Sequence, residues 1–425
     1  MKNEVPQLLL ANGKGDIYTH PYLEATGMKG GSPVRFDHAE LIKLPPASRI
    51  FMLPARHPIG YDPSYGKFVG VSRSLAVAAF TPPGFTLTHS ASYEEALNAT
   101  KMLPLFAYGA VVLYRGEYHT AAVRVDADRR HDSRLINMAR LKKNVAAFRT
   151  IFPENRLVRH LEDCALKYSC PNAQNFFLSR YECPLPTSPS CNAACSGCIS
   201  YQTKPTCSAT QPRIKFIPTP EEVAQVALFH IRKVKDPIVS FGQGCEGEPL
   251  LAGDIIEQSI RLIRKETAKG IININTNASR PQTLIRLLDA GLDSIRVSMN
   301  SGREVYYTRY YKPKGYAFAD VLRSIKVAKG RGAFVSLNYL TMSGFTDQKD
   351  EFRALTRLIE KYHIDMIQWR NLNFDPLQYF KELRVSAEPS QMLGIREIMQ
   401  SLRKRFPRIM MGYFNPSMAK MKERR

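Results

Sequence analysis

Three cysteines lie close together in the segment SPSCNAACSGCISY: Cys191, Cys195 and Cys198. Thiolates are soft ligands that suit zinc and iron–sulfur clusters, and a compact loop with three of them can hold three corners of a cubane. The fourth corner then lacks a protein ligand and is open to another molecule, as in a catalytic zinc site. The triplet predicts a metal site with two alternatives: an open iron–sulfur cluster, or a structural zinc ion with Cys207 as fourth ligand.

Strand and helix patterns alternate after the triplet, as far as about residue 370. The segment 219–234 is a helix that Thr219 opens with Pro220 in its first turn, and the helix at 280–291 is ended by Gly291. With a first strand at PLPTSP there are about six β/α units, which indicates a parallel sheet, either doubly wound or an incomplete barrel. Chemistry in both gathers at the carboxyl ends of the strands.

Polar and small residues stand at these strand ends. Gly247, Glu248 and Pro249 follow the second strand, Thr276 and Asn277 end the third, and Ser298 and Asn300 end the fourth. Any one of these motifs alone fits a polar strand end that caps the next helix. Their order, each at the end of a successive strand, favours one shared site.

The cysteine loop and the strand-end motifs together resemble the radical S-adenosylmethionine (SAM) superfamily over residues 183–375. The resemblance implies a partial (β/α)6 TIM-like barrel in which the three cysteines hold a [4Fe–4S] cluster. It also implies that the open iron chelates SAM, whose reductive cleavage gives a 5′-deoxyadenosyl radical. The residue before the last cysteine is usually aromatic in the family and is Gly197 here.

The resemblance also implies where SAM binds. Glu248 would accept a hydrogen bond from the SAM ammonium, and Ser298 and Asn300 would contact its ribose or carboxylate. Gly344 would turn the backbone beside the adenine, while Thr346 and Asp347 would cap the next helix. The full set of expected cofactor contacts is Gly247, Glu248, Pro249, Thr276, Asn277, Ser298, Asn300 and Gly344.

Other residues have weaker signals. Cys164, Cys170, Cys183 and Cys207 are candidates for an auxiliary cluster, although buried cysteines are commonly inert, as we expect of Cys245. Tyr310, Arg370 and Asn371 are candidates for the substrate side, and the sequence identifies no catalytic residue.

The chain divides into four segments by pattern. We expect a β-rich domain at 1–131, with helical spacing at 92–103, and a helical connector at 132–182. The radical SAM core follows at 183–375, and a helical extension with a basic tail ends the chain at 376–425. No motif indicates the role of the β-rich domain.

Composition limits the partners. The chain has 60 Lys and Arg against 38 Asp and Glu, a formal charge of +22, which favours RNA or a phosphorylated substrate, with a merely basic surface as the alternative. The longest apolar run, 103–114, is too short to cross a bilayer, and the first residues make a poor signal peptide. We therefore expect a cytoplasmic protein with no membrane partner.

The expected function is that of a radical SAM enzyme whose radical abstracts hydrogen from an unidentified substrate. It could be a methyltransferase, another modifier of RNA or metabolites, or an activator of a peptide or protein. A reductant protein of the flavodoxin or ferredoxin type would supply electrons. The alternatives are a non-catalytic iron–sulfur or zinc protein that binds nucleic acid, and an electron carrier.

Overall fold

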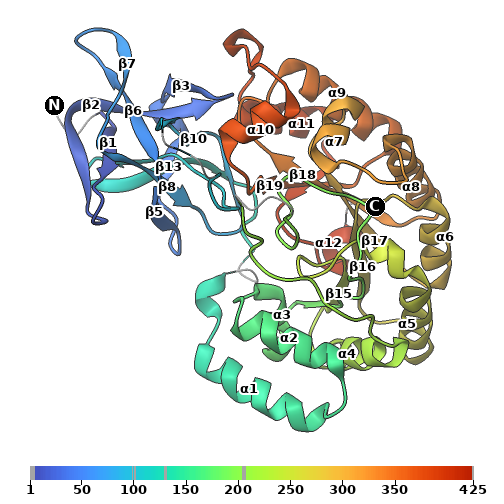
Figure 1. Cartoon of the computed structure of the whole chain (residues 1–425). Coiled ribbons are helices and arrows are strands. Elements are labelled where there is room, and N and C mark those ends of the chain that lie inside the picture. The colour runs from blue at the N-terminus through green and yellow to red at the C-terminus, as the bar shows by residue number, and fades with distance from the viewer. Residues whose placement is uncertain (1–4, 98, 100–101, 129–131, 203–206, 424–425) are drawn as a thin grey trace.

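A computed structural model describes residues 5–97, 99, 102–128, 132–202 and 207–423. Figure 1 shows an antiparallel β domain beside a larger α/β unit, in which strands form an inner arc and helices an outer one. Among the described residues, no helix combines the length and the apolar composition needed to cross a bilayer.

The N-terminal domain is an antiparallel sheet built on short strands, with β1 paired to β2, β8 and β12. The helix expected at 92–103 is wrong at its start, where Tyr93–Glu95 pair with β6 instead. The strands are β1 (Gln7–Ala11), β2 (Ile17–Lys29), β3 (Ser32–Arg35), β4 (Leu41–Lys43), β5 (Arg49–Leu53), β6 (Arg56–Asp62), β7 (Lys67–Gly70), β8 (Leu75–Phe80), β9 (Phe85–Leu87), β10 (Ser90–Ala91), β11 (Tyr93–Glu95), β12 (Val111–Tyr114) and β13 (Glu117–Arg124).

Three helices connect this domain to the α/β unit: α1 (Met138–Ile151), α2 (Arg156–Leu166) and α3 (Pro171–Phe177). They lie beside α4 in Figure 1. Phe148 of α1 packs its ring 5.1 Å from Phe176 of α3 and 5.0 Å from Phe229 of α4. The apolar faces predicted by the helical spacing therefore bury themselves against the first helix of the α/β unit.

The described part of the α/β unit has a parallel sheet of seven strands in sequence order. They are β14 (Glu182–Pro184), β15 (Ile238–Phe241), β16 (Ile271–Thr276), β17 (Ser294–Met299), β18 (Phe334–Thr341), β19 (Met366–Asn371) and β20 (Met410–Gly412). The helices between and after them are α4 (Pro220–Lys233), α5 (Gly253–Glu266), α6 (Pro281–Ala290), α7 (Glu304–Tyr311), α8 (Phe318–Gly330), α9 (Lys349–Tyr362), α10 (Pro376–Leu383), α11 (Ile395–Arg405) and α12 (Met418–Lys422). The result is a partial TIM-like barrel, in which β20 adds a seventh strand to the six expected units.

Local sequence explains how the barrel helices begin and end. Thr219 and Glu222 form a reciprocal capping box at the start of α4, with Pro220 in the first turn as expected. Gly291 ends α6 with φ of +115°, a left-handed conformation that glycine adopts without strain.

Alternation along the strands makes the barrel interior polar. Asn273 and Asn275 on β16 pair in register with Ser294 and Arg296 on β17, and Arg296 pairs with Ser336 on β18. The residues between them, such as Ile272 and Ile274, belong to the large apolar core. Side chains two apart share a face, so the same strands supply a polar lumen and an apolar outer layer.

Helix α12 closes the amino-terminal end of the barrel. Met421 clusters with the first residues of four strands: Ile238, Ile271, Phe334 and Met366. The described part of the basic tail is therefore anchored, and the Lys420 ammonium also lies 3.0 Å from the Asp128 carboxylate.

The N-terminal domain docks on the last part of β19 and the loop after it. Asn371 accepts a hydrogen bond from the Leu87 backbone (2.8 Å) and donates one to the Phe85 carbonyl (2.9 Å). Asp375, fully buried, accepts from the Tyr93 hydroxyl at 2.9 Å and pairs with Arg56 at 3.3 Å. The bond to buried Asp375 draws Tyr93 into the interior, which gives a physical reason why residues 93–95 form a strand where the local spacing favoured a helix.

Candidate active site at the carboxyl end of the barrel

The cysteine loop follows β14 and is held from one side by the end of α7. The backbone of Ala194 donates to the Tyr311 carbonyl, and that of Ser196 to the Tyr310 carbonyl, each at 3.0 Å. Lys314 donates in return to the carbonyl of Asn192 at 2.8 Å. These bonds fix the loop like a short piece of sheet.

The loop after β15 holds the other side. Gly247 donates to the Ser188 carbonyl at 2.6 Å, and Glu248 donates to the Ser190 carbonyl at 2.8 Å. A Cβ at position 247 would lie 1.9 Å from the Ser190 oxygen, so the two backbones approach as closely as glycine alone permits.

The spacing of the three thiols suits a cluster better than a single ion. Burial raises the pKa of Cys195, and the charges of Cys198 and Cys191 raise it further, so the other two thiols lie near Cys195. Yet they do not all lie within 4.8 Å of one another. Tetrahedral zinc needs sulfurs about 3.8 Å apart, because each Zn–S bond is about 2.3 Å. The donor set fits an iron–sulfur cluster.

Arg213 is a neighbour of the third cysteine that the sequence did not single out. Its guanidinium lies 3.5 Å from the Cys198 sulfur and donates to the Ser200 hydroxyl at 3.1 Å. A basic residue fifteen positions after a cysteine gives no recognisable signal, because only the fold of the intervening loop brings them together.

Glu248 is the centre of a buried hydrogen-bond network. Its carboxylate accepts bonds from the backbone of Leu250 at 3.1 Å and of Asn277 at 2.8 Å, and from the Thr276 hydroxyl. Burial raises the pKa of Glu248 to about 7, against the lowering effect of these donors. The expected residues Glu248, Thr276 and Asn277 are thus brought together, and their bonds are to one another.

Two further residues join this network that sequence reasoning missed. The Asn277 amide donates to Asn192 at 2.8 Å, and Asn192 donates to the Ser279 hydroxyl at 2.9 Å. Asn192 directly follows Cys191, so it links the cysteine loop to the end of β16. The sequence did offer one signal for Asn192, namely its position inside the cysteine triplet.

Glu246 organises the turn itself. Its carboxylate, 4% exposed, accepts bonds from the backbones of Gly242 (2.6 Å), Gln243 (2.9 Å), Thr187 (2.8 Å) and Ser188 (3.0 Å). It therefore ties the loop after β15 to the segment that leads into the cysteines. A second carboxylate two residues before Glu248 was a signal that the sequence offered.

Ser298 and Asn300 lie where β17 ends. Asn300 is fully buried and donates to the Tyr379 hydroxyl at 3.2 Å and to the Tyr306 carbonyl at 3.3 Å. Its Oδ1 atom is buried with no hydrogen-bond partner. That free acceptor is available to a donor group of a bound molecule.

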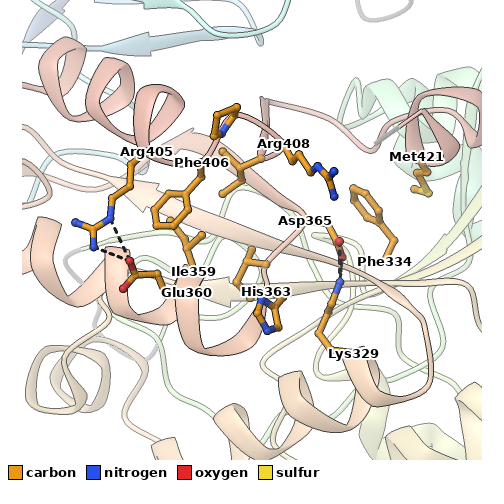
Figure 2. Close-up of a pocket in the computed structure, with 13 residues that line it drawn as sticks. Lys329, Phe334, Ile359, Glu360, His363, Asp365, Arg405, Phe406, Arg408 and Met421 are labelled. Atoms are coloured by element: carbon orange, nitrogen blue, oxygen red, sulfur yellow. Dashed lines mark hydrogen bonds and ion pairs between the residues drawn. The ribbon is translucent and has the colours of Figure 1, made fainter. Parts of the chain in front are cut away.

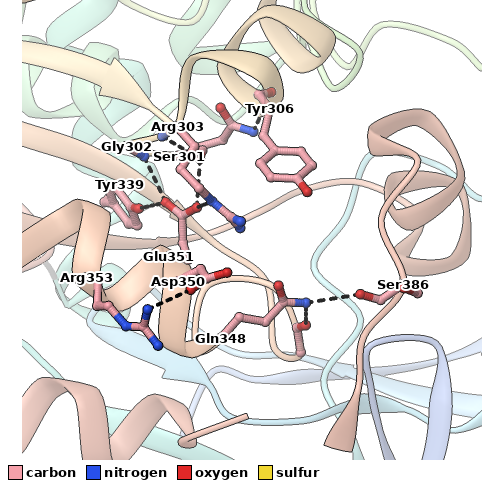
Figure 3. Close-up of polar contacts among 12 residues, drawn as sticks. Ser301, Gly302, Arg303, Tyr306, Tyr339, Gln348, Asp350, Glu351, Arg353 and Ser386 are labelled. Carbon is pink, nitrogen blue, oxygen red and sulfur yellow. Dashed lines mark hydrogen bonds and ion pairs between the residues drawn. The ribbon is translucent and has the colours of Figure 1, made fainter. Parts of the chain in front are cut away.

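Glu351 of α9 fixes the start of α7 (Figure 3). Its buried carboxylate accepts from the Tyr339 hydroxyl (2.5 Å), the Ser301 hydroxyl (2.7 Å), the Gly302 backbone (2.8 Å) and the Arg303 guanidinium (2.8 Å). Because α7 also clamps the cysteine loop, Glu351 contributes to the position of the cysteines from the far side of the helix.

The loop after β18 faces the N-terminal domain. Gly344 has φ of +86°, and a Cβ there would lie 1.9 Å from the Gly30 nitrogen. The expected helix caps are wrong: Thr346 accepts from the Met342 backbone at 3.0 Å and Asp347 from the Gly344 backbone at 2.6 Å. Both side chains stabilise the loop, and Gln348 is the residue that precedes α9.

The three candidates for the substrate side are separated by the fold. Tyr310 lies against the cysteine loop, and a Cβ at Gly197 would be 2.8 Å from its hydroxyl. The ring of Tyr310 thus takes the space that a side chain at 197 would need. Arg370 stacks 4.1 Å over the Tyr413 ring, and Asn371 binds the N-terminal domain as described above.

The four cysteines proposed for an auxiliary cluster are also distributed differently. Cys164 lies beside Cys245 and His160, and Cys170 is next to this group. Cys183 is buried within β14, and Cys207 lies near Asp375.

A further pocket lies away from this site. Its volume is about 770 Å³, and it opens beside the amino-terminal ends of β18 and β19 (Figure 2). The Lys329–Asp365 pair (2.7 Å) and the Arg405–Glu360 pair (2.5 Å) occupy its walls. Catalysis in parallel barrels takes place at the opposite end, so we assign it no part in the chemistry.

Comparison with known proteins agrees with this arrangement. Residues 185–358 match the sequence model of the radical SAM superfamily. Two curated relatives are named molybdenum cofactor biosynthesis protein 1. The mouse protein is 25% identical over 219 residues (51% of this chain, 31% of the relative), and the human protein is 28% identical over 203 residues (45% and 30%).

The chain therefore spans about a third of the length of these relatives. Among solved structures, that of methylornithine synthase covers 63% of this chain and 77% of its own, at 17% identity and a TM-score of 0.39.

Proposed function

We propose that this chain, which belongs to the radical SAM superfamily through residues 185–358, is an enzyme that binds its cluster with Cys191, Cys195 and Cys198. Members of the superfamily use a [4Fe–4S] cluster and SAM, which together supply a 5′-deoxyadenosyl radical for hydrogen abstraction. The observation that carries the assignment is the loop of three thiols, clamped from both sides and spaced too widely for one ion.

The residues around the loop would receive SAM. We assign Glu248 and the Asn192–Asn277–Ser279 chain to the polar end of the cofactor, because they adjoin Cys191. Gly247 and Pro249 shape the same turn, and Ser298 and Asn300 lie two strands further round the barrel. Gly344 is held against Gly30, so its contribution would be to the shape of the rim rather than to the cofactor.

The barrel interior favours a polar, anionic substrate. Arg296 lies on the lumen face and is half-buried; it donates to Gln368 at 3.2 Å, and its Nε atom has no hydrogen-bond partner. Burial, and then the charge of Arg370, lower the pKa of Arg296 to about 10, which still leaves it cationic at neutral pH. The buried Glu182 carboxylate also acts on Arg296. Two guanidinium groups outnumber this one carboxylate and suit a carboxylate or phosphate group, in line with a phosphorylated metabolite.

RNA remains the alternative that the charge of +22 suggests. Binding of RNA should weaken steeply with salt, whereas a small phosphorylated substrate should show a shallow dependence. A radical SAM enzyme also needs a reductant, and we propose a protein of the flavodoxin or ferredoxin type.

The test is anaerobic reconstitution followed by dithionite and SAM, with 5′-deoxyadenosine as the product measured. We expect the product from the wild-type chain and from Cys183→Ala, and none from Cys195→Ala, which should also lose cluster iron. A chain with a full cluster that forms no deoxyadenosine would refute the proposal and favour a non-catalytic nucleic-acid-binding protein.

A further inference from the structure

A second group of soft ligands lies outside the proposed active site. The ligand atoms of His160, Cys164 and Cys245 all lie within 4.8 Å of one another, and no other group of His, Cys, Asp or Glu in the described residues does so. His160 and Cys164 are four apart on α2, which places both on one helix face, with Nε2 3.5 Å from Sγ. Cys245 comes from the loop after β15.

A third thiol borders this group. The backbone of Cys170 donates to the Cys164 carbonyl at 2.9 Å. The charges of Cys164 and Cys170 both help to raise the pKa of Cys245, so Cys170 lies near the group without belonging to its 4.8 Å set. Cys164 and Cys245 are each 2% exposed.

The spacing suits one metal ion. Zinc has bonds of about 2.3 Å to sulfur and about 2.0 Å to nitrogen, so tetrahedral ligands stand about 3.5 Å apart. The sulfurs of the triplet at Cys191, Cys195 and Cys198 are more widely spaced than this limit of 4.8 Å. The two cysteine groups therefore differ in what they can hold.

We propose that His160, Cys164 and Cys245 bind a Zn²⁺ ion. The Cys170 sulfur lies outside their 4.8 Å spacing and would have to turn inward to become the fourth ligand of a closed structural site. Thiolates are the form that binds metal, and burying them together is unfavourable without a cation. The His160 ring nitrogen and the Cys245 sulfur both lie against Cys164, so the three ligand atoms already converge on one point.

The ion would join the connector to the active-site loop. Cys245 immediately precedes Glu246, whose carboxylate holds the turns before the cysteine triplet. A bond from α2 to this point would limit the movement of the loop that carries Glu246 and Glu248. Zinc binding at these residues does not require SAM chemistry.

The direct test is the zinc content of the full, reconstituted chain, measured by mass spectrometry of the metal beside its iron content. We expect about one zinc per chain in the wild type and in Cys183→Ala, and less than about a tenth of that in Cys164→Ala and Cys245→Ala. Cys183→Ala is the matched control because it removes another fully buried thiol.

Equal zinc in all four proteins would overturn the proposal. So would iron that is lost from Cys164→Ala while the triplet is intact, since that result would identify a second cluster. Failure of the proposed radical chemistry would leave zinc content unchanged, so the two proposals fail separately.

A second measurement covers the case in which those variants do not fold. Wild-type chain is treated with iodoacetamide, with and without Zn²⁺, and the modified cysteines are located by peptide mapping. Zinc should protect Cys164, Cys170 and Cys245 at least tenfold and leave Cys207 unaffected. Equal modification with and without zinc, or a Cys164–Cys245 disulfide in the isolated chain, would contradict the site.

Discussion

Replacing Gly247 with alanine should damage the cluster site without touching any cysteine. The new Cβ would lie 1.9 Å from the Ser190 oxygen, 2.4 Å from its carbonyl carbon and 3.1 Å from the Cys191 nitrogen. All three atoms belong to backbone, so no side chain can turn away. A tolerable contact of about 3.0 Å needs a displacement of about 1.1 Å, directly beside the first cysteine.

The cost follows from what that displacement breaks. The bonds from Gly247 to Ser188 and from Glu248 to Ser190 hold the loop, and each contributes about 1 kcal/mol. Overpacking adds about 1–3 kcal/mol. We expect a loss of about 3–5 kcal/mol in the free energy of unfolding, and a fall of about 100-fold in deoxyadenosine formation by any cluster that remains.

Iron content, the visible absorption of the cluster and deoxyadenosine formation would be measured together. Gly330→Ala is the matched control, because a Cβ there meets nothing within 4 Å and φ is not positive. Full iron and a wild-type rate in Gly247→Ala would show that the loop after β15 does not position the cysteines, and would refute the reasoning.

Three other predictions concern single contacts. Arg213→Gln should leave the iron content unchanged and lower the reduction potential of the cluster by about 60 mV, because the cation beside Cys198 stabilises the more negative, reduced cluster. A redox titration followed by EPR would test this, and an unchanged potential would argue against the contact. Burial lowers the pKa of His230 to about 4, so between pH 6.5 and 4 the unfolded chain binds a proton that the folded chain does not. As the pH falls through this window, the free energy of unfolding of the wild type should fall by about 3 kcal/mol more than that of His230→Gln. Urea unfolding at each pH would test this, and parallel stability curves for the two proteins would contradict it. Gly197→Ala should reduce the amount of cluster retained, because the new Cβ would lie 2.8 Å from the Tyr310 hydroxyl, and adding Tyr310→Phe should restore it. If the double variant retains as little iron as the single one, the hydroxyl is not the obstacle.

Local sequence signals were sufficient to predict the helices and strands of the barrel, because these elements depend on residues that are neighbours in sequence. The capping box at Thr219 and the glycine end at Gly291 formed where they were expected. Local signals failed at Tyr93, where a bond to buried Asp375, 282 residues away, favours a strand. They failed again at Thr346 and Asp347, whose side chains stabilise the loop beside Gly30 instead of capping α9.

The sequence by itself determined the three thiols in one loop, the order of polar strand ends and the parallel α/β unit that carries them. These features are set by residue type, spacing and periodicity, which the chain carries without any long-range contact. Only the tertiary structure decided which residues meet: Asn192 with Asn277, Arg213 with Cys198, Tyr310 in the space beside Gly197, and Cys164 with Cys245 rather than Cys183. Each of those pairs joins segments at least fifteen residues apart, so the fold of the intervening chain, and not the spacing of the residues, brings them together.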